Sequence, residues 1–365
     1  MSESENQPLI EVKNLRIEFD VRAGIVKAVD GLDLTINRGK TLGVIGESGC
    51  GKSMTARAIL NMIPKPGKIT SGEIIYHRLL KHKGPSQLED VIDLTKLDPD
   101  GKTIREIRGG EIGMIFQEPM SSLTPVYTVG THINEAVSLH HLIPLQKIGD
   151  QIADSVKAHR SVTKEESRTI AIEMLRRVGI PKPTERVDNY PHQLSGGQRQ
   201  RVMIAIALSC EPAMLIADEP TTALDVSIEA QILDIMTDLQ ETANMSIMFI
   251  THNLGVIAKM AEEIVVMYMG KAVEQARTVE LFQNPKHPYT MALLKSIPKL
   301  GKKVPGERLA SISGMVPDPF HLPTGCVFHP RCPMFMPGKC DKISPRMIQV
   351  GVEHKVSCLL HQEEA

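Results

Sequence analysis

Four short apolar runs recur along the chain, and a polar or glycine-rich segment follows each of them. The runs are Thr41–Ile45, Glu111–Gln117, Ala213–Glu219 and Ser246–Thr251. Each is too short for a helix and lacks the alternation of a half-exposed strand, so each predicts a buried strand. Because helical segments lie between them, the pattern predicts an α/β fold.

The remaining segments follow other periods. Before the first run, short β-rich stretches separated by turn residues predict antiparallel strands at Ile10–Val12, Leu15–Phe19, Ile25–Val29 and Leu32–Ile36. A further strand is expected at Gly72–Tyr76, with a polar insertion after it. Helical spacing predicts an insertion over Val129–Gly179 and a long helix over Arg199–Leu208. After about Gly270 the composition shifts to Pro, Lys and Gly, which predicts a linker and a separate C-terminal unit.

The first apolar run leads into the segment GESGCGKS, which fits the Walker A phosphate-loop pattern G-x-x-x-x-G-K-[ST]. Its glycines let backbone N–H groups turn inward around a phosphate, and a helix starting near Lys52 adds the positive end of its dipole. Lys52 is expected to contact the β- and γ-phosphates of a nucleotide, and Ser53 to bind Mg²⁺. A glycine-rich turn that binds nothing is the alternative. The residues predicted to bind nucleotide here are Gly46, Ser48, Gly49, Cys50, Gly51, Lys52 and Ser53.

Two residues near this loop have a plainer interpretation beside the functional one. Phe19 is the only aromatic residue before the loop, and it can stack on an adenine or belong to the core. Cys50 is a small residue of the loop, although a thiol at a helix N-terminus can have a lowered pKa.

The other three runs also end in polar groups. Gln117 ends the second run, Asp218 and Glu219 end the third in the manner of a Walker B segment, and His252 follows the fourth. The carboxyl ends of strands are where α/β sheets bind ligands. Alone, a strand-end His or Gln is more often a satisfied polar residue than a catalyst, but the joint spacing favours a catalytic site. The segment Leu194–Gln198 places glycines before the long helix, which predicts a second anion site.

Composition and charge limit the class of partner. The 365 residues are 42% hydrophobic, which is enough for a main domain with smaller appendages. A net charge of −1 without long runs of one sign argues against a nucleic-acid surface. No stretch approaches the roughly 20 apolar residues of a spanning helix, and the N-terminus is polar and acidic, so we expect a cytosolic protein.

Four of the six cysteines crowd the C-terminal end: Cys326, Cys332, Cys340 and Cys358. In a reducing compartment such a cluster suggests a metal rather than disulfides. Four thiolates suit tetrahedral zinc or an iron–sulfur cluster, and the spacing does not choose between them. Unliganded structural cysteines are the third interpretation.

The Walker pair and the Leu194–Gln198 segment together resemble the ATP-binding cassette of ABC transporters, over about residues 8–275. Three other stretches are similar to the ATPase subunits of bacterial oligopeptide, dipeptide and nickel importers: Phe116–Pro125, Tyr190–Gln193 and Ala217–Val226. Two further stretches, Asn284–Thr290 and Gly325–Cys332, are similar to the C-terminal extension of the same subunits. The resemblance implies a P-loop NTPase fold with an antiparallel β subdomain. It divides the chain into an ATPase domain at 1–275, with a helical subdomain inserted at about 122–195, and a Cys-containing extension at 276–365.

The resemblance implies transport-coupled ATP hydrolysis with Mg²⁺. By this carry-over, Glu219 positions or polarises the attacking water, and Asp218 helps to hold Mg²⁺. Gln117 touches Mg²⁺ and water and couples to the membrane subunit, while His252 contacts the γ-phosphate. Phosphoryl transfer depends on positioning and charge neutralisation, which suits polar groups fixed at strand ends.

The resemblance also implies a head-to-tail dimer that encloses two nucleotides. Ser195, Gly197 and Gln198 then bind the γ-phosphate held by the partner cassette, and Asp225 lies at the dimer seam. Asn253 departs from the family, which usually has Asp after the His. It keeps hydrogen bonding but loses a charge, so we expect a modest effect.

The implied partners are a second cassette, identical or different, two transmembrane permease subunits and, indirectly, an extracytoplasmic solute-binding protein. The chain would then lie peripherally at the cytoplasmic face of the bacterial inner membrane. The resemblance favours a [4Fe–4S] cluster over zinc for the four cysteines, and leaves peptides, nickel chelates and oligosaccharides open as cargo.

Two other functions compete with the importer. A soluble cassette protein acting on ribosomes or DNA usually has two cassettes in one chain or long coiled-coil insertions, whereas this chain has one cassette and a short insertion. A non-hydrolysing regulatory module conflicts with the presence of Glu219.

Overall fold

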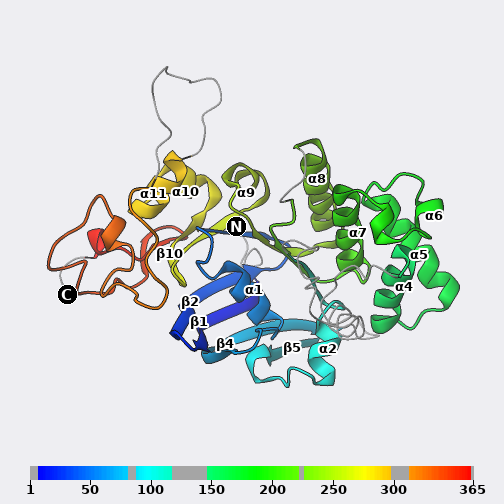
Figure 1. The fold of residues 1–365 in the computed structure, drawn as a ribbon, viewed down its shortest axis with the longest axis horizontal. Coiled ribbons are helices and arrows are strands. Elements are labelled where there is room, and N and C mark those ends of the chain that lie inside the picture. Colours follow the sequence, from blue (N-terminus) through cyan, green and yellow to red (C-terminus); the bar gives the residue numbers. More distant parts are fainter. Residues whose placement is uncertain (1–6, 81–87, 117–145, 222–225, 297–311, 363–365) are drawn as a thin grey trace, which may run out of the picture. The chain divides into compact units, whose positions relative to one another are not determined.

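The computed structural model of the chain describes residues 7–80, 88–116, 146–221, 226–296 and 312–362 (Figure 1). The chain divides into two compact units. The first, here called the phosphate-loop unit, comprises residues 1–37, 41–96 and 250–365. The second, the signature unit, comprises residues 38–40 and 97–249 and contains the Leu194–Gln198 segment.

An antiparallel sheet of four strands in the order β2-β1-β4-β5 forms part of the phosphate-loop unit (Figure 1). Its strands are β1 (Pro8–Val21), β2 (Gly24–Asn37), β4 (Gly67–Leu80) and β5 (Leu88–Asp93). The antiparallel pairing was predicted, but the four short N-terminal runs are two long strands. The pairing of β1 with β2 shifts register between Val12 and Leu15, where Asn14 has a φ of 46°. A β-bulge therefore lies where turn residues suggested a break between two short strands.

A second set of strands in this unit has the order β11-β12-β10-β9-β3. Strand β3 (Thr41–Ile45) is parallel to β9 (Glu263–Tyr268), and β9 is antiparallel to β10 (Lys271–Arg277). The C-terminal strands β11 (Ile348–Gly351) and β12 (His354–Val356) continue this set through β10. The prediction of a linker directly after Gly270 is therefore wrong, because strand β10 begins at Lys271. Strand β10 buries Val273 and Ala276 among more exposed positions. The polar composition of this stretch gives too weak an apolar pattern to predict the strand from sequence.

The helices of the phosphate-loop unit are short. They are α1 (Lys52–Ile59), α9 (Leu254–Met260), α10 (Thr278–Gln283) and α11 (Pro288–Lys295), with 3₁₀ turns at Leu94–Lys96, His329–Arg331 and Leu359–His361. Side chains begin two of them: Asn253 accepts hydrogen bonds from the backbone N–H groups of α9, and His287 from that of Tyr289 in α11. These caps satisfy donors that a helix leaves unpaired.

The signature unit has three buried strands at its centre. Strand β6 (Ile112–Ile115) pairs in parallel with β7 (Met214–Asp218), and β8 (Ser246–Ile250) is the other neighbour of β7. All their residues are buried, which confirms three of the strands predicted from apolar runs. The described helices are α2 (Lys102–Ile107), α4 (Ile148–His159), α5 (Lys164–Arg177), α6 (Pro183–Arg186), α7 (Gly196–Leu208) and α8 (Val226–Ala243), with a 3₁₀ turn at Pro191–Gln193.

Helices α4 and α5 confirm the helical structure predicted for the later part of Val129–Gly179, whereas residues 129–145 lie outside the described residues. Helix α5 starts at a capping box in which Thr163 and Glu166 bond to each other's backbone. Within the described ranges, no helix combines the length and apolar character needed to cross a bilayer.

Glu274 of β10 joins the C-terminal strands to the segment before α11. Its side chain is 0% exposed and accepts hydrogen bonds from the backbone N–H groups of Lys286 at 2.6 Å and His287 at 2.9 Å. His354 Nε2 of β12 lies 2.8 Å from its Oε1. One buried carboxylate is therefore bonded to three groups from two other parts of the chain, as a buried polar group must be satisfied.

We predict that Glu274→Gln lowers the free energy of unfolding by about 1–3 kcal/mol, because the amide group must turn an N–H donor toward one of these donors. Thermal and urea denaturation measure the change. The matched control is Glu73→Gln, since Glu73 is 53% exposed and 3.6 Å from Lys96 Nζ, and such pairs contribute little. Equal losses for the two variants would contradict the role given to Glu274.

Candidate functional site

The phosphate loop lies between β3 and α1, where the sequence predicted it. Gly46 has a φ of 153° and Gly51 a φ of 102°. A Cβ on Gly46 would lie 2.2 Å from the carbonyl oxygen of Met267 in β9, and one on Gly51 would lie 2.4 Å from that of Ala28 in β2. The loop therefore requires glycine at both positions, for its conformation and for its closeness to neighbouring strands.

Lys52 begins α1, as predicted, and its side chain is held over the loop. The residue is 7% exposed, and its Nζ donates to the carbonyl oxygens of Gly46 at 2.8 Å and Glu47 at 3.0 Å. Gly51 caps α1 without a side-chain hydrogen bond, which leaves the helix N–H groups to other acceptors. An ammonium group and a helix N-terminus together suit a phosphate, and the half-buried Ser53 follows directly.

Cys50 is buried at 2% exposure, and its Sγ lies 3.6 Å from Lys52 Nζ. Burial raises the pKa of the Cys50 thiol, and the nearby Lys52 offsets this only in part. The lowered pKa considered for a thiol at this helix N-terminus is therefore not found. Cys50 serves as a small, protonated packing residue beside Gly46.

The two carboxylates of the Walker B segment end β7. Asp218 is its last residue and is 3% exposed. Glu219 is half-buried and has a φ of 49°, a left-handed conformation that is unfavourable for glutamate. Such strain persists where surrounding contacts impose it, and it is typical of functional positions. Gln200 of α7 supplies one such contact, because its Nε2 donates to the Pro220 carbonyl at 2.7 Å.

The Leu194–Gln198 segment forms the start of α7. Ser195 is the N-cap, and it forms a capping box with Gln198: the serine Oγ accepts from the Gln198 N–H at 3.3 Å, and Gln198 Oε1 accepts from the Ser195 N–H at 3.2 Å. Ser195 is exposed, while Gly197 and Gln198 are half-buried. The helix therefore presents its N-terminus at the surface in the geometry that binds anions.

The other predicted residues have different outcomes. His252 is exposed and directly follows β8 and Thr251. The adjacent Asn253 accepts from Gly255 and Val256 N–H groups at 3.0 and 3.4 Å, a cap that asparagine and aspartate can both make. Gln117 and Asp225 lie outside the described residues. Phe19 is half-buried and pairs with Gly67 of β4, and its stacking on adenine stays a prediction.

Comparison with known proteins agrees with this set of elements. The family described as ABC transporter matches residues 29–222, and the family described as oligopeptide/dipeptide transporter, C-terminal region, matches residues 273–340. This chain belongs to the ABC transporter family. The family is one of ATPases, so ATP hydrolysis is its expected activity, and the α/β P-loop fold predicted from the sequence is confirmed.

Relatives cover nearly the whole chain. The oligopeptide transport ATP-binding protein AppD of Bacillus subtilis is 43% identical over 98% of this chain and 98% of its own. The dipeptide transport ATP-binding protein DppD of Haemophilus influenzae is 41% identical over 96% of this chain and 94% of its own. Among solved structures, the dimeric post-hydrolysis state of the cassette MJ0796 bound to ADP and Pi has a TM-score of 0.59 and 25% identity, covering 74% of this chain and 98% of that one.

The four C-terminal cysteines of this ABC protein lie near one another. Cys340 and Cys358 are each 7% exposed, and the Cys326 N–H donates to the Cys340 carbonyl at 2.8 Å. Burial, and then the charges of the other three thiols, raises the pKa of Cys358 to about 11. Yet across the described segments, no group of three or more His, Cys, Asp or Glu side chains is arranged to hold a metal. The structure therefore does not support the predicted metal site, which stays a prediction.

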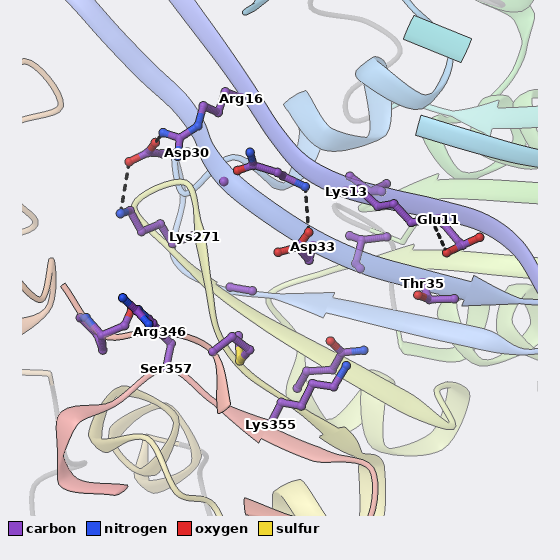
Figure 2. A pocket seen from close by; sticks show the side chains of 18 of the residues that line it. Glu11, Lys13, Arg16, Asp30, Asp33, Thr35, Lys271, Arg346, Lys355 and Ser357 are labelled. Atoms are coloured by element: carbon purple, nitrogen blue, oxygen red, sulfur yellow. Dashed lines mark hydrogen bonds and ion pairs between the residues drawn. The ribbon is translucent and has the colours of Figure 1, made fainter. Parts of the chain in front are cut away.

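A cavity of about 660 Å³ lies in the phosphate-loop unit, lined by β1, β2, β10 and the C-terminal strands (Figure 2). Asp30 in its wall pairs with Arg16 and, at 3.2 Å, with Lys271, and Lys13 pairs with Glu11 at 2.8 Å. Of the residues predicted to bind ATP, none that the structure describes lines it. The cavity is therefore a separate feature from the nucleotide site.

Sequence reasoning missed how the phosphate loop is held by distant residues. Tyr289 Oη accepts from the Glu47 N–H at 2.9 Å, and Arg331 forms an ion pair with the Glu47 carboxylate. Tyr289 lies in Asn284–Thr290 and Arg331 in Gly325–Cys332, two stretches that resemble the importer family. No local spacing signals these contacts, because 242 and 284 residues separate the partners.

Proposed function

We propose that this chain is the ATP-hydrolysing subunit of an ABC importer for peptides or related solutes. The observation that carries the proposal is the match to the oligopeptide/dipeptide transporter C-terminal region in a chain that also has a complete phosphate loop. Relatives named for oligopeptide and dipeptide transport match nearly its full length. A soluble cassette acting on ribosomes or DNA is not favoured, because these relatives are transport proteins by name.

The proposed hydrolysis assigns a separate role to each predicted residue. Lys52 neutralises charge on the β- and γ-phosphates, and the backbone of the loop donates hydrogen bonds to them. Ser53, Asp218 and Gln117 would hold Mg²⁺, which when bound neutralises phosphate charge. The half-buried, strained Glu219 orients the attacking water, and His252 contacts the γ-phosphate. Fixed groups at strand ends cost little reorganisation during the reaction.

The proposed assembly is a head-to-tail dimer with a second cassette. In it, the exposed N-terminus of α7 with Ser195, Gly197 and Gln198 binds the γ-phosphate held by the partner, and Asp225 lies at the seam. The dimer binds two permease subunits at the cytoplasmic face of the membrane, which receive solute from an extracytoplasmic binding protein. We keep the division into an ATPase domain, 1–275, and an extension, 276–365, as part of this proposal.

Glu219→Gln is predicted to keep ATP binding while lowering hydrolysis by at least about a hundredfold, because it removes the carboxylate that orients water but keeps its size. ATP-bound dimers should accumulate. Phosphate release measures turnover, and light scattering after size-exclusion chromatography measures the dimer. In a mixed dimer the partner's site is inactivated first.

The control for this variant is Lys52→Ala, which should lose nucleotide binding itself. If Glu219→Gln lost as much affinity for ATP as Lys52→Ala, the role given to Glu219 in orienting water would be wrong. It would also be wrong if Glu219→Gln hydrolysed ATP as fast as the unmodified protein. If Glu219→Gln bound ATP but stayed monomeric, the proposed head-to-tail dimer that encloses two nucleotides would be refuted.

The helical insertion at about 122–195 is predicted to dock on a cytoplasmic segment of a permease subunit. A photo-crosslinking residue placed at exposed Asp154 in α4 or Lys164 in α5 should link to the permease in the assembled complex, with a yield that changes on adding ATP. The matched control is exposed Lys342 in the extension. Efficient links from Lys342 alone would reject the insertion as the docking surface.

Protein purified without oxygen is predicted to contain iron and sulfide as a [4Fe–4S] cluster bound by Cys326, Cys332, Cys340 and Cys358. Ligation would stabilise this Pro- and Gly-rich segment, by an amount that reaches about 10 kcal/mol in zinc-type sites. Metal and sulfide analysis tests this, and single Cys→Ser variants should lose the metal. Stoichiometric zinc without iron would replace the cluster by a zinc site, and protein free of both would leave the cysteines structural.

A further inference from the structure

Glu47, the second residue of the phosphate loop, is held through three of its groups. Its carbonyl oxygen accepts from Lys52 Nζ at 3.0 Å, and its backbone N–H donates to Tyr289 Oη at 2.9 Å. Its carboxylate accepts two hydrogen bonds from Arg331, at 2.6 Å from Nη1 to Oε2 and 3.0 Å from Nη2 to Oε1. Three separate groups of Glu47 therefore hold this residue in its place in the loop.

Arg331 is itself buried and donates four hydrogen bonds. Its side chain is 4% exposed, against 25% for Glu47. Besides the bidentate pair, Nη1 donates to Tyr268 Oη at 3.2 Å and Nε donates to the Ser313 carbonyl at 3.2 Å. A bidentate guanidinium–carboxylate pair fixes geometry as well as charge, which a lysine cannot reproduce.

An aromatic cluster holds the segment that carries Arg331 in place. Phe328 is 1% exposed, and its ring packs edge-on against Tyr268 at 5.2 Å and Tyr289 at 5.4 Å between centroids. Tyr289 belongs to α11 within the extension, whereas Tyr268 ends β9, the strand that pairs with β3 before the phosphate loop, so Phe328 anchors the extension on β9. The ion pair therefore belongs to a packed interface rather than to a flexible tail.

A carboxylate in a phosphate loop has an electrostatic cost. An anionic side chain one residue from Gly46 repels a polyphosphate, and the repulsion is stronger where water is partly excluded. The guanidinium of Arg331 neutralises this carboxylate and keeps it bonded toward the extension. Removing only the arginine would leave a negative charge beside the nucleotide site and free the loop to move.

We propose that Arg331 is a positioning residue for ATP binding: through Glu47, the C-terminal extension neutralises the phosphate loop and fixes its backbone. The inference rests on the proposed binding of ATP by this loop. It assigns the extension a direct part in nucleotide affinity, separate from any metal site.

The test compares MgATP binding by full-length variants, measured by calorimetry. Arg331→Met should weaken binding by about tenfold, in the range of couplings between contacting charged residues. The double variant Glu47→Gln with Arg331→Met should recover most of this loss, because the uncompensated carboxylate is then gone. Arg331→Lys keeps the charge and should bind better than Arg331→Met. In the assembled ATPase, Arg331→Met should raise KM more than it lowers kcat.

Arg346→Met is the matched control, since Arg346 is exposed and in the same extension. It should bind MgATP like the parent. Melting temperatures identify unfolded variants, and if Arg331→Met does not fold, Arg331→Lys and Glu47→Gln with Arg331→Lys replace the pair. If Arg331→Met bound MgATP as tightly as the unmodified protein, the inference would be overturned. It would also be overturned if Glu47→Gln with Arg331→Met bound MgATP as weakly as Arg331→Met alone. Failure of the parent to bind MgATP would instead refute ATP binding by the loop.

Discussion

The conformation of the phosphate loop is the constraint on which the surrounding structure depends. Its backbone must turn N–H groups inward, so glycines with positive φ are needed, and these leave room for strands to approach closely. The carbonyl of Met267 in β9 and that of Ala28 in β2 occupy this room. The Gly270 N–H after β9 also donates to the Cys50 carbonyl at 3.0 Å. The loop is therefore shaped by the neighbouring strands β2 and β9, and not only by its own residues.

In the signature unit a related constraint acts on Glu219. Its left-handed φ of 49° is costly, and the turn that contains it is held by Gln200, which is 6% exposed. Gln200 belongs to α7, the helix whose N-terminus carries Ser195. One helix thus joins the Leu194–Gln198 segment to the turn that contains Glu219. A displacement at the N-terminus of α7 would reach Glu219 through a single hydrogen bond.

The parts predicted correctly from sequence are those with a local period or motif: the buried strands, the phosphate loop with Lys52 at the start of α1, and the helix after Leu194–Gln198. Errors arose where tertiary contacts override local signals. A bulge at Asn14 replaced a turn, and β10 formed in a polar stretch because β9 and β12 pair with it. The contacts of Glu47 had no sequence signal, since pairing across 284 residues depends on the folded chain. The four cysteines were found by composition, but composition does not fix the directions of their side chains.

The link between the phosphate loop and the extension must act in both directions. Arg331 is buried, and a buried guanidinium without its carboxylate would strongly destabilise the segment that contains it. The folded extension therefore depends on the loop conformation that offers Glu47. Since coupling between two sites is reciprocal, an extension that favours the nucleotide-binding conformation of the loop must be stabilised when nucleotide binds. If Arg331 has the proposed role, its contact with Glu47 would let ATP occupancy influence a segment outside residues 29–222, the part of the chain that matches the ABC transporter family.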